Sequence, residues 1–208
     1  MKTIVKQLLC LCCAALLLCG SLAFASGESS SDASAETREV VYPETAAEYI
    51  ENAISCKNFS DEEVSDEILA DIVAAGIQAP SAMNSQPWQF IIVKDADLKD
   101  ALVSGAPAVV IVAVPEEDYT MGGDSQFAAG TAAEAMYLYA QSIGLGAHMY
   151  TAPVAMVLST DEAEAEYGSA DGYEAAVVLA FGYYADYPDS FTGATVRSDY
   201  DSFVTVIG

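Results

Sequence analysis

Ten residues between a helical pattern and a strand pattern, Ala79 to Trp88 (APSAMNSQPW), constrain this chain more than any other segment. Pro80 and Pro87 fix φ at both ends of the segment and remove two amide donors. A stiff polar loop at a helix-to-strand connection is a common place for a ligand site. The side chains that can face a planar, polar ligand are Ser81, Asn84, Ser85 and Gln86. The alternative is an ordinary connection between a helix and a strand.

The first 25 residues have the pattern of a secretory signal peptide. Lys2 and Lys6 precede an apolar run, and Ala23-Phe24-Ala25 is a small-x-small cleavage signal. We therefore expect an exported, extracytoplasmic protein that lacks residues 1–25, with an acidic, Ser-rich disordered linker over residues 26–40. The folded domain is expected over residues 41–208, and no transmembrane helix is expected, since the apolar run is short.

Cysteine usage fits this interpretation. Four of the five cysteines lie in the leader, namely Cys10, Cys12, Cys13 and Cys19. Only Cys56 remains after cleavage, so an intrachain disulfide is excluded. Lipid attachment at Cys19 is the minority alternative, because Leu18 precedes it where that signal prefers a small residue.

The chain is strongly acidic. It carries 7 basic and 31 acidic side chains, a formal net charge of −24. Loss of the two lysines of the leader gives 5 minus 31, or −26. Such a surface repels nucleic acid and anionic lipid, and it slows the approach of polyanionic NAD(P)H. Charge therefore favours neutral or cationic partners.

Apolar spacing predicts three helices. They cover residues 45–55, a segment that starts at a Ser65 N-cap, and residues 123–143. The last of these is rich in alanine, which allows close helix approach and predicts a central or interface position.

Runs of β-branched and aromatic residues predict buried strands over residues 88–94, 107–114 and 173–184. A further strand-like stretch, residues 203–207 (FVTVI), ends the chain. Because there is no regular βαβ repeat, these elements predict a three-layer α+β sandwich.

Four segments, in order along the chain, resemble the nitroreductase family. The loop at Pro80 resembles its first flavin-contacting segment. The run from Ala53 to Phe59 (AISCKNF) resembles its Arg-x-Ser-x-Arg/Lys pattern, keeping Ser55 and Lys57 but with Ala53 in place of the first arginine. Gly144-Leu145-Gly146 resembles its Gly-Leu-Gly turn beside the flavin ring, and Thr195-Val196-Arg197 resembles its phosphate-binding Lys-x-Arg pair with Thr195 replacing the lysine.

The resemblance implies a mixed central β-sheet flanked by helices and a C-terminal extension that embraces the partner subunit of a homodimer. It also implies FMN at the dimer interface and no metal. Because the flavin carries the chemistry at N5, no catalytic side chain is assigned. The implied cofactor-binding residues are Ser55, Lys57, Pro80, Ser81, Asn84, Gln86, Gly144, Gly146, Thr195 and Arg197.

Thr195 has a second context. The run from Asp189 to Thr195 (DSFTGAT) resembles the Asp-x-x-Ser/Thr-Gly-Ala-Thr/Ser signal at which a flavin transferase esterifies FMN to the final hydroxyl. An ordinary turn is the alternative. Export favours covalent attachment, because a dissociable cofactor is lost where free FMN is scarce.

The resulting hypothesis is an exported, FMN-dependent oxidoreductase that reduces a small nitroaromatic or quinone-like acceptor with electrons from a membrane-associated redox partner. The alternatives are a conventional NAD(P)H-dependent nitroreductase and a flavin-holding electron-transfer module without its own substrate. Tyr119, Phe127 and Tyr150 are candidates for the exposed face of the ring. The sole histidine, His148, is expected to be a packed or surface residue, and Cys56 a small core residue.

Overall fold

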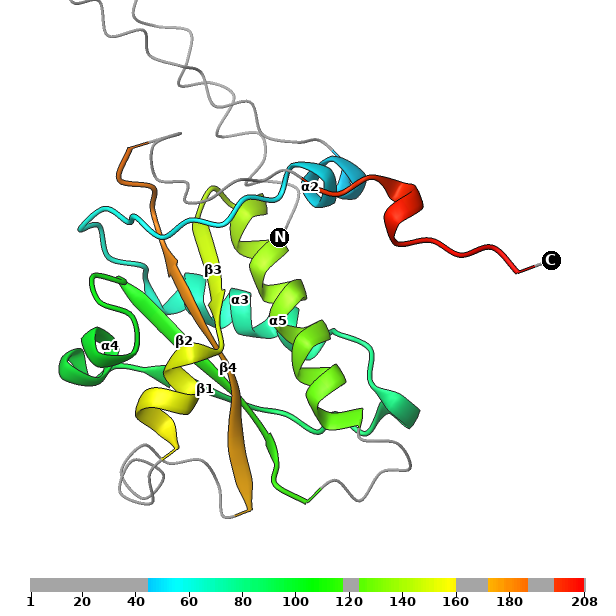
Figure 1. The fold of residues 1–208 in the computed structure, drawn as a ribbon. Helices are drawn as coiled ribbons and strands as arrows, with labels where there is room; N and C mark the ends of the chain where they lie inside the picture. Colours follow the sequence, from blue (N-terminus) through cyan, green and yellow to red (C-terminus); the bar gives the residue numbers. More distant parts are fainter. Residues whose placement is uncertain (1–44, 118–123, 160–171, 187–196, 208) are drawn as a thin grey trace, which may run out of the picture. The chain divides into compact units, whose positions relative to one another are not determined.

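The computed structural model describes residues 45–117, 124–159, 172–186 and 197–207. The chain divides into two compact units, Met1–Val40 and Val41–Gly208, and the described residues belong to the second. In that unit a four-stranded sheet has helices on both faces (Figure 1).

The strands β1 (Gln89–Val93), β2 (Ala108–Pro115), β3 (Gly146–Tyr150) and β4 (Tyr173–Gly182) have the spatial order β1-β2-β4-β3. All three neighbouring pairs are antiparallel. The α+β class is therefore confirmed, whereas the expectation of a mixed sheet is wrong for these four strands. Among the residues that the structure describes, the one parallel contact is an isolated bridge between Ser55 and Ala147, because the segment at the edge of β3 contributes a single paired residue there.

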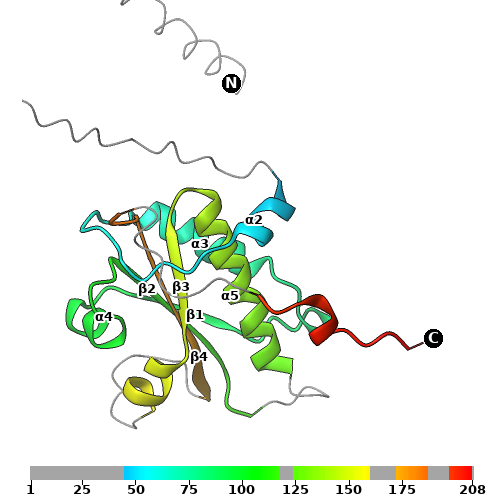
Figure 2. The ribbon, with the colours of Figure 1, turned by 45° about the horizontal axis from the view of Figure 1, so that its top comes forward.

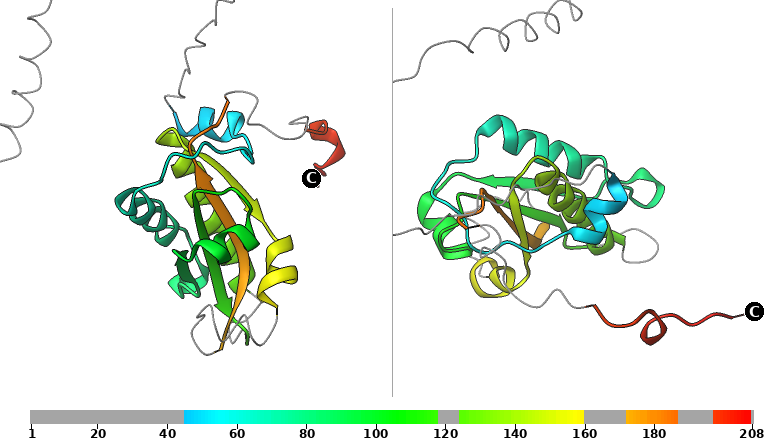
Figure 3. Two further views of the ribbon diagram at one scale, coloured as in Figure 1. Left: turned by 90° about the vertical axis from the view of Figure 1, so that its left-hand side faces the viewer. Right: turned by 90° about the horizontal axis from the view of Figure 1, so that it is seen from above.

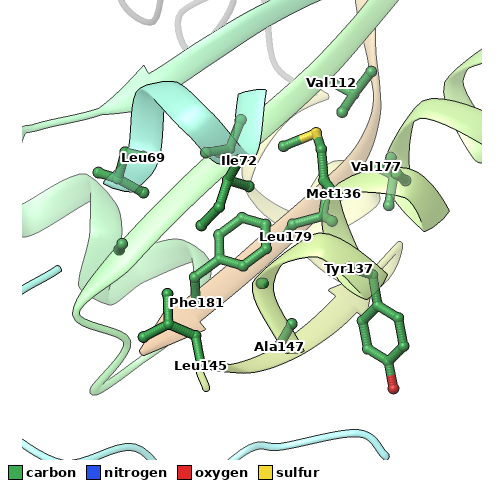
Figure 4. Packing of buried hydrophobic residues seen from close by; sticks show 14 of the residues in the cluster. Leu69, Ile72, Val112, Met136, Tyr137, Leu145, Ala147, Val177, Leu179 and Phe181 are labelled. Atoms are coloured by element: carbon green, nitrogen blue, oxygen red, sulfur yellow. The ribbon is translucent and has the colours of Figure 1, made fainter. Parts of the chain in front are cut away.

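Both faces of β2 are buried, which explains its unbroken apolar sequence. On one face Val110 and Val112 pack with α3 (Asp66–Ile77) and α5 (Asp124–Ser142), in the cluster drawn in Figure 4. On the other face Val109 and Ile111 pack with α4 (Ala96–Leu102) and a short π-helix, η2 (Val154–Leu158). The molecule thus has the three expected layers, which Figure 3 shows edge-on.

The helices begin where side chains cap them. The Ser65 Oγ accepts the Ile68 N–H at 3.2 Å, so the predicted cap of α3 is confirmed. Thr45 caps α2 (Ala46–Asn52) in a reciprocal pair with Glu48, but α2 ends before residue 55 because Ala53 turns the chain into an extended segment. Within the described residues, no helix has the length and apolar character needed to cross a bilayer.

The strand expected over residues 203–207 does not form. A 3₁₀ turn, η3 (Tyr200–Ser202), is followed by extended chain that pairs with no described strand. The side chains of Phe203, Val206 and Ile207 are 76%, 85% and 94% exposed. Figure 2 shows this segment running away from the helices and the sheet. A β-type sequence therefore finds no strand edge to pair with among the described residues.

Candidate functional site

The extended segment after α2 is attached to the edge of the sheet. The Cys56 N–H donates to the Ala147 carbonyl at 3.0 Å, beside the parallel bridge between Ser55 and Ala147. Further on, the Ser60 N–H donates to the Tyr183 carbonyl at 2.8 Å. These bonds hold Ser55 at the start of β3, next to the carboxyl-terminal end of α5.

Two side chains of α5 meet this segment. The Oε1 atom of Gln141 accepts the Ile54 N–H at 3.0 Å. Tyr137, one turn earlier, is 7% exposed. The side chains of Ser55 and Gln141 and the charges of Glu134 and Arg197 act on its hydroxyl. Burial raises the pKa of Tyr137 and the charge of Glu134 raises it further. The polar side chains of Ser55 and Gln141, and the charge of Arg197, lower that pKa.

We call Ser55, Tyr137, Gln141 and Arg197 the donor cluster. It unites two of the predicted phosphate-binding residues, Ser55 and Arg197, which lie far apart in sequence. Hydroxyl, amide and guanidinium groups all donate hydrogen bonds, and one of them carries a positive charge, so the cluster suits an anionic group such as a phosphate monoester. Sequence reasoning missed Tyr137 and Gln141.

The other cations are placed differently. Lys57 is exposed, and its charge acts on His148, whose pKa is lowered first by burial and then by this lysine. Lys94 pairs with Asp66, and the Lys99 ammonium donates to the Pro107 carbonyl at 3.0 Å. Within the described part of the chain, Arg197 is therefore the cation whose charge acts on Tyr137, and Lys57 does not act on it.

The glycine turn has structural reasons of its own. Gly144 has φ of +86°, and the Leu145 N–H donates to the Ala140 carbonyl at 2.9 Å, which completes a Schellman ending of α5. A Cβ on Gly146 would lie 2.6 Å from the Cys56 Sγ. These glycines thus end a helix and admit Cys56, independently of any ligand.

The predicted loop forms a tight, strained structure. The Gln86 N–H donates to the Ser81 Oγ at 3.0 Å, and the Gln86 side-chain amide donates to the Asn84 carbonyl at 3.4 Å. The φ angles of Met83, Asn84 and Gln86 are 50°, 55° and 49°. Residues other than glycine adopt this left-handed backbone conformation at an energetic cost. Such strain concentrates at functional sites.

The loop and the donor cluster lie at different positions along α5. The Thr131 hydroxyl donates to the Pro80 carbonyl at 3.2 Å, whereas Gln141 contacts Ile54. The helical rise puts about 15 Å between these two helix positions. Pro80, Ser81, Asn84 and Gln86 are therefore not brought to the donor cluster within one chain.

A second group lies on the opposite face of β3. The rings of His148 and Tyr150 meet edge-on at 4.4 Å, and the His148 Nδ1 is buried without a hydrogen-bond partner among the described residues. Cys56 is fully buried and desolvation raises its thiol pKa to about 11, which confirms it as a core residue. Within the described ranges, no cluster of three His, Cys, Asp or Glu side chains is arranged to hold a metal ion.

Several predictions fall outside the described residues. These are the signal peptide, the linker, Tyr119 and the flavin-transferase signal with its acceptor Thr195. Of the other aromatic candidates for the ring face, Phe127 is 71% exposed on α5 and Tyr150 is half-buried on β3.

Comparison with known proteins gives a consistent set of matches. Residues 50–104 match the model of the Nitroreductase family. A protein of Methanothermobacter thermautotrophicus, provisionally named NADH dehydrogenase/NAD(P)H nitroreductase, is 29% identical over 109 residues, which cover 48% of this chain and 57% of that protein. The match thus spans little more than half of this relative.

Solved structures share the fold. A nitroreductase with bound FMN from Desulfitobacterium hafniense has a TM-score of 0.65 at 24% identity, covering 78% of this chain and 97% of the other. A nitroreductase with bound FMN from Bacteroides fragilis has a TM-score of 0.62 at 18% identity, covering 78% and 98%. The fold is therefore nitroreductase-like, and the family match supports the same relationship.

Proposed function

We propose that this chain belongs to the nitroreductase family, binds FMN and acts as an oxidoreductase that reduces a small organic acceptor. The observation that carries the proposal is that Ser55 and the charge of Arg197 both act on Tyr137, at the junction of α5 and the segment that pairs with β3. Ser55 and Arg197 are two of the positions that the family resemblance assigns to the FMN phosphate. FMN supplies hydride and electron transfer at N5 when bound.

The protein side of the site fits this cofactor. The donor cluster presents hydroxyl, amide and guanidinium groups, which suit the phosphate. The strained loop at Pro80 presents polar side chains and amides that suit the polar edge of a flavin ring. Because it lies about 15 Å along α5 from the donor cluster, the loop is suited to a different part of the cofactor from the phosphate, or to the cofactor of a second subunit.

We propose a homodimer for the same reason. The C-terminal segment carries Phe203, Val206 and Ile207 exposed to solvent, although apolar side chains are normally covered. Pairing of this segment with a second copy would cover them, in line with the embracing extension that the resemblance implies. Size-exclusion chromatography with light scattering tests this: a dimer is expected, and a monomer in the flavin-loaded form would contradict it.

Export and covalent attachment are further parts of the proposal. The leader pattern supports export, and the seven-residue signal ending at Thr195 supports an ester between FMN and that hydroxyl. An ester keeps the cofactor attached where free FMN is dilute. The acceptor lies two residues before Arg197, so the linkage would be made next to a residue of the donor cluster.

The electron donor is proposed to be a membrane-associated redox partner. The net charge of −24 supports this, because it disfavours the approach of polyanionic NAD(P)H and leaves neutral acceptors unaffected. The names of the relatives favour NAD(P)H instead, so the two donors must be compared directly. In air-free buffer, rapid bleaching of the flavin by NADPH would contradict the membrane-associated donor and would favour a conventional NAD(P)H-dependent reductase.

Absorbance and intact mass test the cofactor. Protein made in a host that supplies FMN and the flavin transferase should be yellow and should carry the mass of one FMN. Thr195→Ala should abolish the adduct, and Thr205→Ala, outside the signal, should keep it. Colourless protein would refute the function, whereas yellow protein with an unmodified mass would refute only the ester.

Acceptor use separates an enzyme from an electron-transfer module. Reduced protein should be reoxidised faster by nitroaromatics or quinones than by a second flavoprotein. The reverse order would favour the module without a substrate of its own.

A further inference from the structure

We propose that Tyr137 and Gln141 of α5 donate hydrogen bonds to the FMN phosphate, so that two neutral side chains replace the cation that is missing at Ala53. This inference rests on the proposed function and names two residues that neither the family pattern nor the sequence motifs assign. It concerns binding of the phosphate alone and requires no role in the redox chemistry.

The Gln141 amide has a fixed orientation. Its Oε1 atom accepts the Ile54 N–H at 3.0 Å, which directs the Nε2 atom the other way. That Nε2 is buried and has no partner at hydrogen-bond distance and angle within the described chain, although the Gln141 side chain lowers the pKa of the nearby Tyr137. Buried donors are almost always paired, so an unpaired one requires an explanation. A phosphate oxygen beside the donor cluster provides the missing acceptor.

Tyr137 stands one turn before Gln141, so both side chains lie on the same face of α5. The tyrosine is 7% exposed, yet Figure 4 shows its hydroxyl directed away from the aliphatic side chains of the core. Ser55 and the charge of Arg197 both lower the pKa of that hydroxyl. An anion that binds Ser55 would therefore lie close to the Tyr137 hydroxyl and would also be attracted by the charge of Arg197.

The distribution of positive charge explains why neutral donors are needed. Ala53 is half-buried and packs against the core, so it supplies neither charge nor hydrogen bond to a ligand. Lys57 acts on His148, on the opposite face of β3. Arg197 therefore bears the charge of the donor cluster, and hydrogen bonds from uncharged groups must contribute the rest of the phosphate affinity.

The test compares FMN with riboflavin, which has the same ring and sugar chain but no phosphate. Flavin-free protein, made in a host without the flavin transferase, is titrated with each compound, and flavin fluorescence gives the dissociation constants. Tyr137→Phe removes only the hydroxyl. Gln141→Glu keeps an oxygen for the Ile54 N–H and replaces the free donor with a negatively charged acceptor. Tyr139→Phe removes a hydroxyl elsewhere on α5 and serves as the matched control.

We expect Tyr137→Phe to weaken FMN binding about tenfold and Gln141→Glu to weaken it more, since hydrogen bonds to charged groups are strong. Riboflavin binding should be unchanged in both, and Tyr139→Phe should leave both dissociation constants unchanged. Thermal melts of the flavin-free proteins show whether each variant is folded. Because FMN and riboflavin are compared on the same variant, a change in stability affects both dissociation constants alike.

The outcomes are distinct. Dissociation constants for FMN and riboflavin that both stay at the wild-type value in both variants overturn the inference and leave the proposed function intact. Equal weakening of both flavins in both variants also overturns it, because the residues would then act on the ring or on the fold. Wild-type protein that binds neither flavin overturns the proposed function itself.

Discussion

Replacing Gly146 with alanine is expected to force the extended segment after α2 off the edge of the sheet. The new Cβ would lie 2.6 Å from the Cys56 Sγ and 2.7 Å from its Cβ. Ordinary contacts between carbon atoms are about 3.5–4.0 Å, so the segment around Cys56 and the start of β3 must separate by about 1 Å. The Cys56 Cβ moves only with its backbone, so the 3.0 Å hydrogen bond from Cys56 N–H to the Ala147 carbonyl is stretched.

The magnitude follows from two contributions. Overpacking a buried position costs about 1–3 kcal/mol, and weakening one backbone hydrogen bond adds about 0.5–1 kcal/mol. We therefore expect Gly146→Ala to lower the free energy of unfolding by about 1.5–4 kcal/mol, which is a large part of the stability of a typical domain. Urea unfolding of the flavin-free protein, followed by circular dichroism, measures it.

A matched control and a rescue make this prediction specific. Gly130, in the middle of α5, has nothing within 4 Å of an added Cβ, so Gly130→Ala should stabilise the protein by about 0.5–1 kcal/mol. Adding Cys56→Gly to Gly146→Ala removes both clashing atoms and should recover about 1–2 kcal/mol relative to the sum of the single changes. Gly146→Ala with wild-type stability, or a coupling energy near zero, would refute the packing argument.

Three further outcomes are expected. Ser65→Ala should lower the free energy of unfolding by about 1 kcal/mol in urea, because α3 loses the acceptor for the Ile68 N–H; an unchanged midpoint would contradict the cap. Cys56, buried with its pKa raised to about 11, should resist iodoacetamide at pH 8 until urea unfolds the domain, and rapid alkylation of folded protein would count against its burial. Glu134→Gln should tighten FMN binding severalfold at low salt, by removing a negative charge beside the Tyr137 hydroxyl, and equal tightening of riboflavin would contradict that cause.

Local sequence signals predicted the elements that local interactions define. The apolar spacing after Ser65 identified α3, and its cap follows from one hydroxyl three residues before the N–H that it accepts. The β-branched runs identified β1 and β2, since β2 is buried on both faces and needs apolar residues throughout.

Elements defined by remote partners were missed. β3 reads Gly-Ala-His-Met-Tyr, which has no β-branched residue, and it becomes a strand by pairing with β4 about thirty residues later. The stretch over residues 203–207 has the composition of a strand, yet finds no partner within the described chain. The presence or absence of a pairing partner, more than the intrinsic β-propensity of the residues, therefore explains why β3 is a strand and residues 203–207 are not.

The candidate site shows the same division. Ser55 and Arg197 could be proposed from motifs, but Tyr137 and Gln141 read as ordinary positions of an apolar helix. Their role depends on the Ile54 N–H, which contacts Gln141 across 87 residues of sequence. A tyrosine and a glutamine four residues apart, just before a Gly-Leu-Gly turn, are the signal that could have drawn notice.

Backbone hydrogen bonds such as the one from the Cys56 N–H to the Ala147 carbonyl hold the segment that begins at Ser55 against the sheet edge, so local opening of the segment must break them. In the proposed function, a phosphate bound between this segment and α5 would stabilise the closed arrangement. The dissociation rate of FMN would then be limited by the rate at which this segment opens. Deuterium uptake at the Cys56 amide, whose bond to Ala147 must break first, would report that opening directly.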